Sequence, residues 1–148
     1  MVRVRKTTYI DTSVWCAFAF NEPEMPGAVM WLAEWDMDLA ASSAWAHAEF
    51  YSASQVKWRN KSATQAGINR AAKVFESAYT MAHALRVMEA DFEHASQLCR
   101  TQKKMRAGDA LHLAIALRHG CAALASLDKD MNQAAQAVGL KLATFNDH

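Results

Sequence analysis

The chain has 148 residues, a length typical of one domain, and we expect residues 1–148 to fold as a single domain. Hydrophobic residues make up 52% of the chain, with only 5 glycines and 2 prolines, which disfavours disorder and all-β folds. A net charge of +1 means that any nucleic acid would have to be held by a local basic patch. No apolar run is long enough to span a bilayer and no signal-peptide pattern opens the chain, so we expect a cytoplasmic protein that contacts no membrane.

The first quarter of the chain predicts one strand followed by two helices. Thr7–Asp11 is β-branched and aromatic, and it runs into Thr12 and Ser13, two residue types that favour the start of a helix. The apolar stretch Val14–Phe20 is the first predicted helix. After a break rich in turn residues, Gly27–Trp35 has the spacing of a second helix.

The middle of the chain predicts a brief strand and two longer helices. Leu39–Ala41 is the strand, and Ser42 or Ser43 caps a helix that continues to about Val56. A further helix is predicted to begin at Ser62.

The remaining segments continue the same alternation of strand and helix. The predicted strands are Leu85–Met88, Ala122–Leu127 and Leu140–Thr144, and the predicted helices are one capped by Asp91, one over Asp109–Leu117 after Gly108, and one from Asp128 to about Val138. Gly120 and Gly139 are expected to end two of these helices. The alternation predicts a three-layer α/β/α fold around a mainly parallel sheet of about four to five short strands.

Four acidic residues fall where such a fold places its functional crevice, beyond the carboxyl ends of the strands. Asp11 and Asp128 follow predicted strands, Asp109 begins an apolar helix, and Glu49 lies beside the apolar stripe of another helix. Each aspartate could instead be an ordinary helix cap. Glu49 fits that alternative less well, because a charge beside an apolar stripe is costly without a counter-ion. Asp130 is read as a helix-surface charge.

Converging carboxylates would repel one another unless a cation lay between them. Oxygen ligands without cysteine or histidine favour Mg²⁺ or Mn²⁺, with one or two ions per site, and the chemistry implied is hydrolysis at phosphorus by metal-activated water. His112, one turn after Asp109, is interpreted as a core residue or a support for the acids. The phosphate-binding and nucleophile-elbow motifs of nucleotide-binding proteins and serine hydrolases are absent, so no nucleotide cofactor is expected.

Two further features bear on partners. Lys57, Arg59 and Lys61 surround Trp58, a combination that can contact RNA by charge and by base stacking, although a solvated helix face is an equally good reading of the charges. The other four tryptophans are expected to pack in the core or between subunits. The three cysteines lack the pattern of a disulfide framework or zinc site and are interpreted as small buried hydrophobic residues.

Four motifs in order resemble the PIN-domain family, in particular VapC-type toxins of bacterial toxin–antitoxin pairs. They are YIDTS (Tyr9–Ser13), SAWAHAEF (Ser43–Phe50), RAGDALHLAIA (Arg106–Ala116) and SLDKDM (Ser126–Met131), the last with serine where threonine is usual. The resemblance implies a Mg²⁺- or Mn²⁺-dependent endoribonuclease, with catalytic and metal-binding acids at Asp11, Glu49, Asp109 and Asp128. It implies that Thr12, Ser13 and Ser126 orient phosphate or the acids. It also implies a homodimer and a cognate antitoxin that occupies the active-site groove.

Three questions stay open at this point. Arg106 could contact substrate phosphate or pair with a carboxylate. A PIN-like module that binds RNA or protein without catalysis is a rival, although such a module has no physical reason to keep four mutually repelling acids. A phosphatase of the haloacid-dehalogenase kind is a weaker rival, because that family needs a second aspartate where this chain has Ser13.

Overall fold

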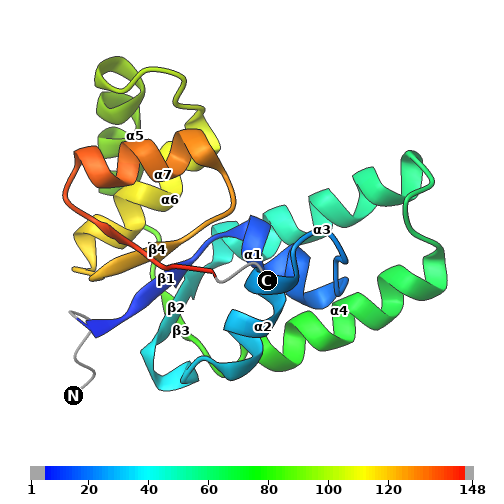
Figure 1. The fold of residues 1–148 in the computed structure, drawn as a ribbon. Coiled ribbons are helices and arrows are strands. Elements are labelled where there is room, and N and C mark those ends of the chain that lie inside the picture. Colours follow the sequence, from blue (N-terminus) through cyan, green and yellow to red (C-terminus); the bar gives the residue numbers. More distant parts are fainter. Residues whose placement is uncertain (1–5, 146–148) are drawn as a thin grey trace.

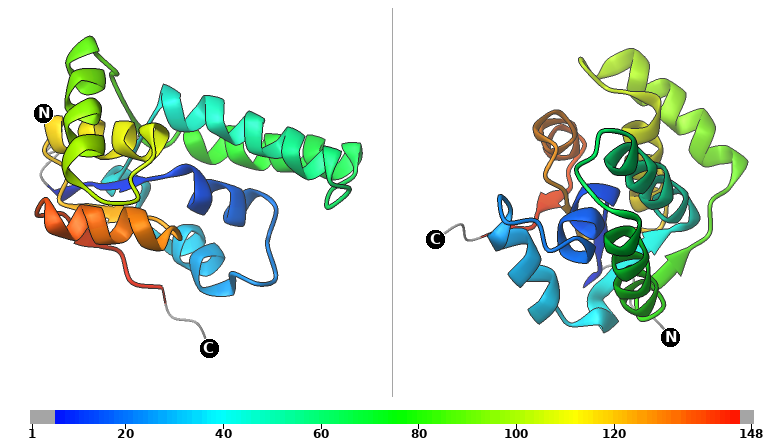
Figure 2. Two further views of the ribbon diagram at one scale, coloured as in Figure 1. Left: turned by 90° about the horizontal axis from the view of Figure 1, so that it is seen from above. Right: turned by 90° about the vertical axis from the view of Figure 1, so that its right-hand side faces the viewer.

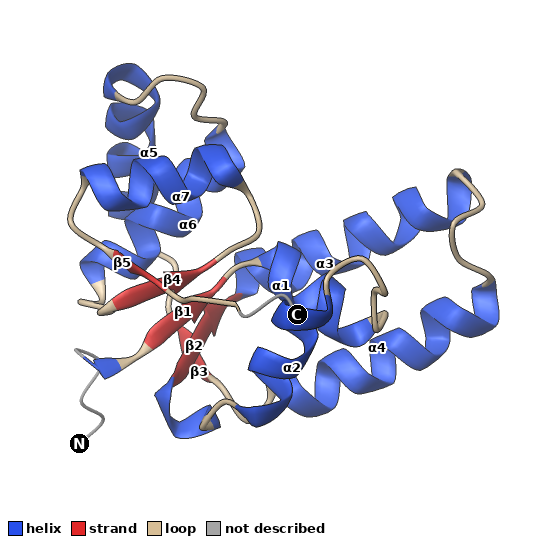
Figure 3. Cartoon of the chain, viewed as in Figure 1, coloured by secondary structure: helices blue, strands red, loops and turns tan. Residues whose placement is uncertain are grey.

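A computed structural model of the chain describes residues 6–145, and it has a central parallel sheet with helices on both faces (Figures 1 and 3). The strands are β1 (Thr8–Ile10), β2 (Ala40–Ser43), β3 (His83–Leu85), β4 (Ala123–Ala125) and β5 (Lys141–Leu142). The helices are α1 (Thr12–Ala19), α2 (Pro26–Glu34), α3 (Ala44–Arg59), α4 (Gln65–Tyr79), α5 (Glu89–Thr101), α6 (Ala107–Arg118) and α7 (Lys129–Ala137). A single 3-10 turn, Met37–Leu39, precedes β2.

The strand order β3-β2-β1-β4-β5 separates two cores, one on each face of the sheet. Along β1 successive side chains point to opposite faces, so Tyr9 packs with α5, α6 and α7 while Ile10 packs with α1, α2, α3 and α4. Both strands beside β1 pair with it in parallel, with Tyr9 opposite Ala41 on one side and Leu124 on the other. The predicted three-layer α/β/α fold with a parallel sheet is confirmed.

Helices α3 and α4 form a long hairpin that projects away from the sheet (Figures 1 and 2). Only the part nearest the sheet shares its core, where the rings of Phe50 and Phe75 stack at 3.9 Å between centroids. Trp15 of α1 closes this cluster edge-on against Phe75 and is fully buried, as the sequence predicted for a core tryptophan. The far end of the hairpin, by contrast, is open to solvent at Trp58, whose side chain is 51% exposed.

Several helix boundaries follow from local sequence as expected. The side chains of Ser43 and Asp128 accept hydrogen bonds from the first turns of α3 and α7, so both act as N-caps. Gly120 and Gly139 follow the ends of α6 and α7 with φ of +71° and +93°, a conformation that suits glycine at the end of a helix. At α1 the cap is Asp11 itself, one residue before the predicted Thr12 or Ser13.

Two predictions around β3 are wrong. The strand is His83–Leu85 and overlaps the predicted Leu85–Met88 only at Leu85, because its register is set by pairing with β2 rather than by its own sequence. Asp91 does not cap α5 from outside. It lies within the first turn, where its carboxylate accepts a hydrogen bond from the backbone N–H of Met88, the actual N-cap, at 2.8 Å.

Two helix starts also differ from the predictions. Helix α4 begins at Gln65 rather than Ser62, because Lys61 adopts a left-handed φ of +63° and the hydroxyl of Thr64 caps the helix. Helix α6 begins before Gly108 rather than after it, with Arg106 in the N-cap position.

All three cysteines are free thiols. Cys16 and Cys121 are buried as expected, but Cys99 is only partly buried, and none of the three forms a disulfide. No helix within residues 6–145 is long and apolar enough to cross a membrane. Residues 1–5, on which the signal-peptide prediction partly rests, lie outside the described residues.

The topology defines where a functional crevice should lie. From β1 the chain moves outward to β2 and β3, and then returns to the other side of β1 to form β4 and β5. In an open parallel sheet, such a reversal leaves a crevice at the carboxyl ends of the two strands that flank it. Here those ends are Asp11 after β1 and Ser126 after β4.

Candidate active site

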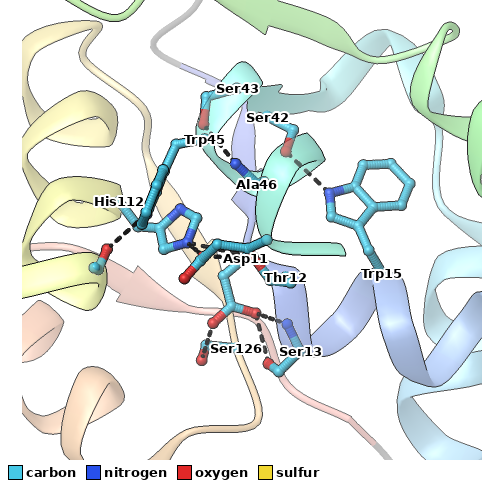
Figure 4. A network of polar contacts seen from close by, with 12 residues as sticks. Asp11, Thr12, Ser13, Trp15, Ser42, Ser43, Trp45, Ala46, His112 and Ser126 are labelled. Carbon is cyan, nitrogen blue, oxygen red and sulfur yellow. Dashed lines mark hydrogen bonds and ion pairs between the residues drawn. The ribbon is translucent and has the colours of Figure 1, made fainter. Parts of the chain in front are cut away.

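Asp11 is the most enclosed acid at this edge, with a side chain only 5% exposed in the crevice between β1 and β4. One carboxylate oxygen accepts hydrogen bonds from the backbone N–H of Ser13 at 3.0 Å and from its hydroxyl at 2.6 Å. The other accepts from the hydroxyl of Ser126 at 2.6 Å (Figure 4). Burial nevertheless raises the pKa of Asp11, against the lowering effect of His112 and of these hydrogen bonds.

The two serines join Asp11 to the loop after β4. The hydroxyl of Ser13 accepts from the backbone N–H of Leu127 at 2.9 Å, and that of Ser126 accepts from the N–H of Asp128 at 3.0 Å. Each hydroxyl therefore donates to the carboxylate and accepts from the loop. This arrangement fixes the loop, and with it the start of α7, against the end of β1.

Glu49 lies on α3, and its half-buried carboxylate points toward α1 and α6. The same oxygen, Oε1, accepts hydrogen bonds from the hydroxyl of Thr12 at 2.8 Å and from Nε2 of His112. Burial raises the pKa of Glu49, but the hydrogen bond and charge of His112, together with Thr12, outweigh it, so the net pKa is lowered. His112 is thus a hydrogen-bonding partner for the carboxylate that the sequence places beside an apolar stripe.

Tyr9 holds His112 from the other side, a contact that the sequence analysis missed. Its phenolic oxygen lies 2.6 Å from Nδ1 of His112 and 2.7 Å from the hydroxyl of Ser43, and all three side chains are buried. Residues two apart in a strand point to the same face, so the side chains of Tyr9 in β1 and of Asp11 just after it are expected on the same face of the sheet. That spacing is the sequence signal that could have connected Tyr9 with the acids.

Asp109 and Asp128 complete the set of acids from the first turn of α6 and the N-cap of α7. The pKa of Asp109 is raised to about 6, chiefly by burial and then by the negative charges of Asp128, Asp11 and Glu49, while His112 lowers it. Asp128 is exposed and caps α7 by accepting from the N–H of Met131 at 2.9 Å. The other three acids named from the sequence therefore lie close enough to Asp109 for their charges to raise its pKa.

The raised pKa of Asp109 predicts a pH-dependent cost to the fold. Between about pH 4 and 6 the native state holds this proton more tightly than the unfolded chain, so stability falls as pH rises through that range. We expect Asp109→Asn to raise the melting temperature at pH 7.5 by about 3 °C, equivalent to about 1 kcal/mol after discounting for solvent screening.

Thermal unfolding at a series of pH values, without divalent ions, checks this expectation. The advantage of Asp109→Asn should shrink steadily as pH falls from 7 to 4. Asp38→Asn, on the exposed 3-10 turn, is the control and should leave the melting temperature unchanged. An Asp109→Asn protein that melts at or below the wild-type temperature at pH 7.5 would contradict the electrostatic account.

A metal site is not preformed in the orientations that these side chains adopt. Within residues 6–145 no three His, Cys, Asp or Glu side chains are grouped as ligands of one ion, so the expected carboxylate cage is not seen. The oxygen donors still fit Mg²⁺ or Mn²⁺ chemically, and Mg²⁺ often uses only one or two carboxylates and keeps its waters. The raised pKa of Asp109 is the observation that favours a cation, because positive charge would offset both the burial and the nearby negative charges that raise it.

The basic residues named from the sequence occupy two separate places. Arg106 is exposed at the N-cap of α6, and within the described part of the chain it forms no ion pair with a carboxylate. Trp58, Arg59 and Lys61 lie at the far end of α3 and in the turn after it, where they line an open hollow together with Thr64. Lys57 turns back, pairing with Glu22 at 2.9 Å.

The distance between these places matters for any RNA substrate. Trp58 is nine residues beyond Glu49 on α3, which corresponds to about 13 Å along the helix axis. The tip of the hairpin is therefore separate from the crevice that holds the acids. Lys57 faces Glu22 and also lies over the ring of Phe20, so its charge is largely neutralised within the protein.

Comparison with known families agrees with the fold and the order of the acids. The PIN domain family matches residues 8–146, which is nearly the whole chain. A search among curated proteins finds no match. The acids of this chain lie near the carboxyl ends of β1 and β4, where the strand order of the parallel sheet reverses. The chain belongs to the PIN domain family, whose members are generally metal-dependent nucleases.

Proposed function

We propose that this protein is a divalent-metal-dependent endoribonuclease and that residues 1–148 form one PIN domain. The observation that carries the proposal is the proximity of four carboxylates at the β1–β4 crevice, where burial and then the charges of Asp128, Asp11 and Glu49 raise the pKa of Asp109 to about 6. Mutually repelling acids cost stability, and a bound Mg²⁺ or Mn²⁺ would remove that cost. The proposed ligands are drawn from Asp11, Glu49, Asp109 and Asp128, holding one or two ions.

The residues of the chain supply orientation and phosphate attraction. When bound, the ion would activate water and stabilise charge on the cleaved phosphodiester. Ser13 and Ser126 hold the carboxylate of Asp11 in place, and Thr12 with His112 does the same for Glu49. The N-termini of α1, α6 and α7 carry partial positive charge that favours a phosphate.

Arg106 is the side chain that we assign to substrate phosphate. It stands exposed at the N-cap of α6, three residues before Asp109, and it has no carboxylate partner within residues 6–145. Trp58, Arg59 and Lys61 are proposed as a second contact for RNA at the tip of the α3–α4 hairpin. Lys57 was named with them from the sequence, but its ion pair with Glu22 makes it the weakest member of that group.

The biological setting is also a proposal. The VapC-type motifs support a toxin role, with action in the cytoplasm, a homodimer and a cognate antitoxin that covers the acids. Induction of the protein alone should then arrest bacterial growth, and co-expression of its cognate antitoxin should restore it.

A matched pair of glutamates tests the catalytic proposal. Glu49 and Glu76 each bind a histidine, His112 and His47 respectively, but only Glu49 lies among the acids. With a panel of structured and single-stranded RNAs, we expect wild-type cleavage in Mn²⁺ or Mg²⁺ and none in EDTA. Glu49→Gln should lower cleavage by about 100-fold or more, whereas Glu76→Gln should retain it.

The rival function is a PIN-like module that holds RNA or protein without cutting. The absence of a preformed three-ligand group among the described residues favours this rival. Calorimetric titration with Mn²⁺ separates the two functions. A nuclease should bind Mn²⁺ in wild-type form and lose that binding in Asp109→Asn, whereas a binding module should give no Asp109-dependent heat and no RNA cleavage with either ion.

A further inference from the structure

An apolar groove of about 520 Å³ opens between α5 and α6 beside the acids. Its walls include Leu111 of α6 and Cys99 of α5, and Phe92 stands at its edge with 54% of its surface exposed. Trp45 of α3 and Gly108 of α6 also line it. We call this the α5–α6 groove.

The groove adjoins the candidate active site at Gly108. The indole N–H of Trp45 donates to the carbonyl of Gly108 at 3.1 Å, which fixes the plane of the ring (Figure 4). A Cβ atom at Gly108 would lie 3.3 Å from the Trp45 ring and 3.2 Å from a carboxylate oxygen of Glu49. Gly108 is therefore close to both Trp45 of the groove and Glu49 of the candidate active site, and Asp109 follows Gly108 directly in the chain.

The chemistry of the groove fits a flat ring attached to an anion. Aromatic and aliphatic carbon atoms form most of its lining, and no carboxylate takes part in it. Its one charged residue is Arg100, which is exposed and forms no ion pair within residues 6–145. A nucleobase has an apolar π-face that stacks on such side chains, and the phosphate of its nucleotide suits a free guanidinium.

We propose that the α5–α6 groove binds one nucleobase of the RNA strand adjacent to the cleaved phosphodiester, stacked on Trp45 or Phe92 with Arg100 facing its phosphate. This inference rests on the proposed ribonuclease function and adds a base-selecting site to it. A second copy of the chain could cover the same apolar surface. A base is favoured because the groove adjoins Glu49 and Asp109 at Gly108 and its lining includes the exposed cation Arg100.

Cys99 offers a direct probe of occupancy that does not depend on cleavage. It is the partly buried cysteine in the groove, while Cys16 and Cys121 are buried elsewhere and serve as internal references. We expect at least one of AMP, GMP, CMP and UMP at millimolar concentration to slow alkylation of Cys99 by iodoacetamide at least threefold, measured by mass spectrometry. Inorganic phosphate at the same concentration should protect less.

Two variants test the role in substrate selection. Phe92→Ala removes the exposed ring and Ser96→Phe fills the groove, and both positions are exposed on α5. Met81→Ala, exposed far from the groove, is the control. Sequencing of cleaved RNA ends should show that both groove variants lose base preference at one position beside the cut. Their Kd for RNA should rise about fivefold to tenfold, while Met81→Ala behaves as wild type.

The outcomes separate this proposal from the ribonuclease itself. Cleavage with unchanged base preference and unchanged Kd in both groove variants would overturn the base site and leave the nuclease standing. If no RNA is cleaved by the wild type, the nuclease fails, and unprotected Cys99 would then overturn the groove site as well. A change from dimer to monomer in Phe92→Ala by sedimentation, without nucleotide protection of Cys99, would identify the groove as a contact between copies.

Discussion

Asp11→Asn is expected to lower divalent-dependent RNA cleavage by about 1,000-fold, which corresponds to about 4 kcal/mol of transition-state stabilisation. Asp11 is the acid at the centre of the crevice, bonded through both oxygens to residues of α1 and the β4–α7 loop. Replacement by asparagine removes the negative charge that would hold a cation. It keeps the shape of the side chain and one oxygen that can accept from Ser13.

The folded state should survive this change, which makes the result interpretable. The amide of an asparagine at position 11 can donate to Ser126 where the carboxylate accepted, and asparagine is as good an N-cap as aspartate. We expect a melting temperature within a few degrees of wild type. Asp130→Asn is the matched control, because Asp130 is an exposed acid on the first turn of α7, as the sequence analysis interpreted it.

Initial cleavage rates in Mn²⁺ and sequencing of RNA ends after induction in cells provide the measurements. Asp130→Asn should cleave at the wild-type rate and leave the same ends. If purified Asp11→Asn cleaves as fast as the wild type, Asp11 does not hold a catalytic ion and the proposed mechanism fails.

Arg118→Met is expected to have the largest effect on stability, about 3 kcal/mol of destabilisation. The carboxylate of Asp91 is almost fully buried and accepts from Nε of Arg118 at 2.6 Å and from Nη2 at 3.1 Å, in addition to the N–H of Met88. This pair joins the start of α5 to the end of α6. Removal of the guanidinium leaves a buried carboxylate with one remaining donor.

Denaturant unfolding of Arg118→Met, Asp91→Asn and the double variant measures this pair. The double variant should recover much of the loss, because it leaves no unpaired buried charge. Arg70→Met, at an exposed position of α4, is the control and should change stability by less than about 0.5 kcal/mol. Equal losses in Arg118→Met and Arg70→Met would show that the pair contributes nothing specific.

The same pair predicts a pH dependence opposite in sign to that of Asp109. Burial raises the pKa of Asp91, but the hydrogen bonds from Arg118 and Met88 and the charge of Arg118 outweigh it, so the net pKa is lowered. A lowered native pKa stabilises the fold above the pKa of the unfolded state, and this contribution is lost as pH falls through the native value. Asp91→Asn lacks this stabilising charge, whereas Asp109→Asn removes a destabilising one. Acid unfolding should therefore begin at a higher pH in Asp91→Asn than in Asp109→Asn.

The sequence by itself determined the succession of strands and helices, the position of the three aspartates at a strand end or helix start, and the position of Glu49 inside a helix. These properties depend on short-range patterns: β-branched and aromatic residues in Thr8–Ile10, the cap at Ser43, and the glycines that follow α6 and α7. The four PIN motifs were recognisable for the same reason, since each is a local segment. The predicted strand near Leu85 was misplaced because its pairing with β2 is not local.

Only the tertiary structure decided which side chains meet. Glu49 is held by His112, 63 residues away in the chain, and Asp11 by Ser126, 115 residues away. Local periodicity shows that a residue faces the core, but the identity of its partner depends on strand order and helix packing, which bring distant segments together. Tyr9 beside His112, Lys57 turned to Glu22, and the groove beside Trp45 are for that reason features of the fold rather than of any segment.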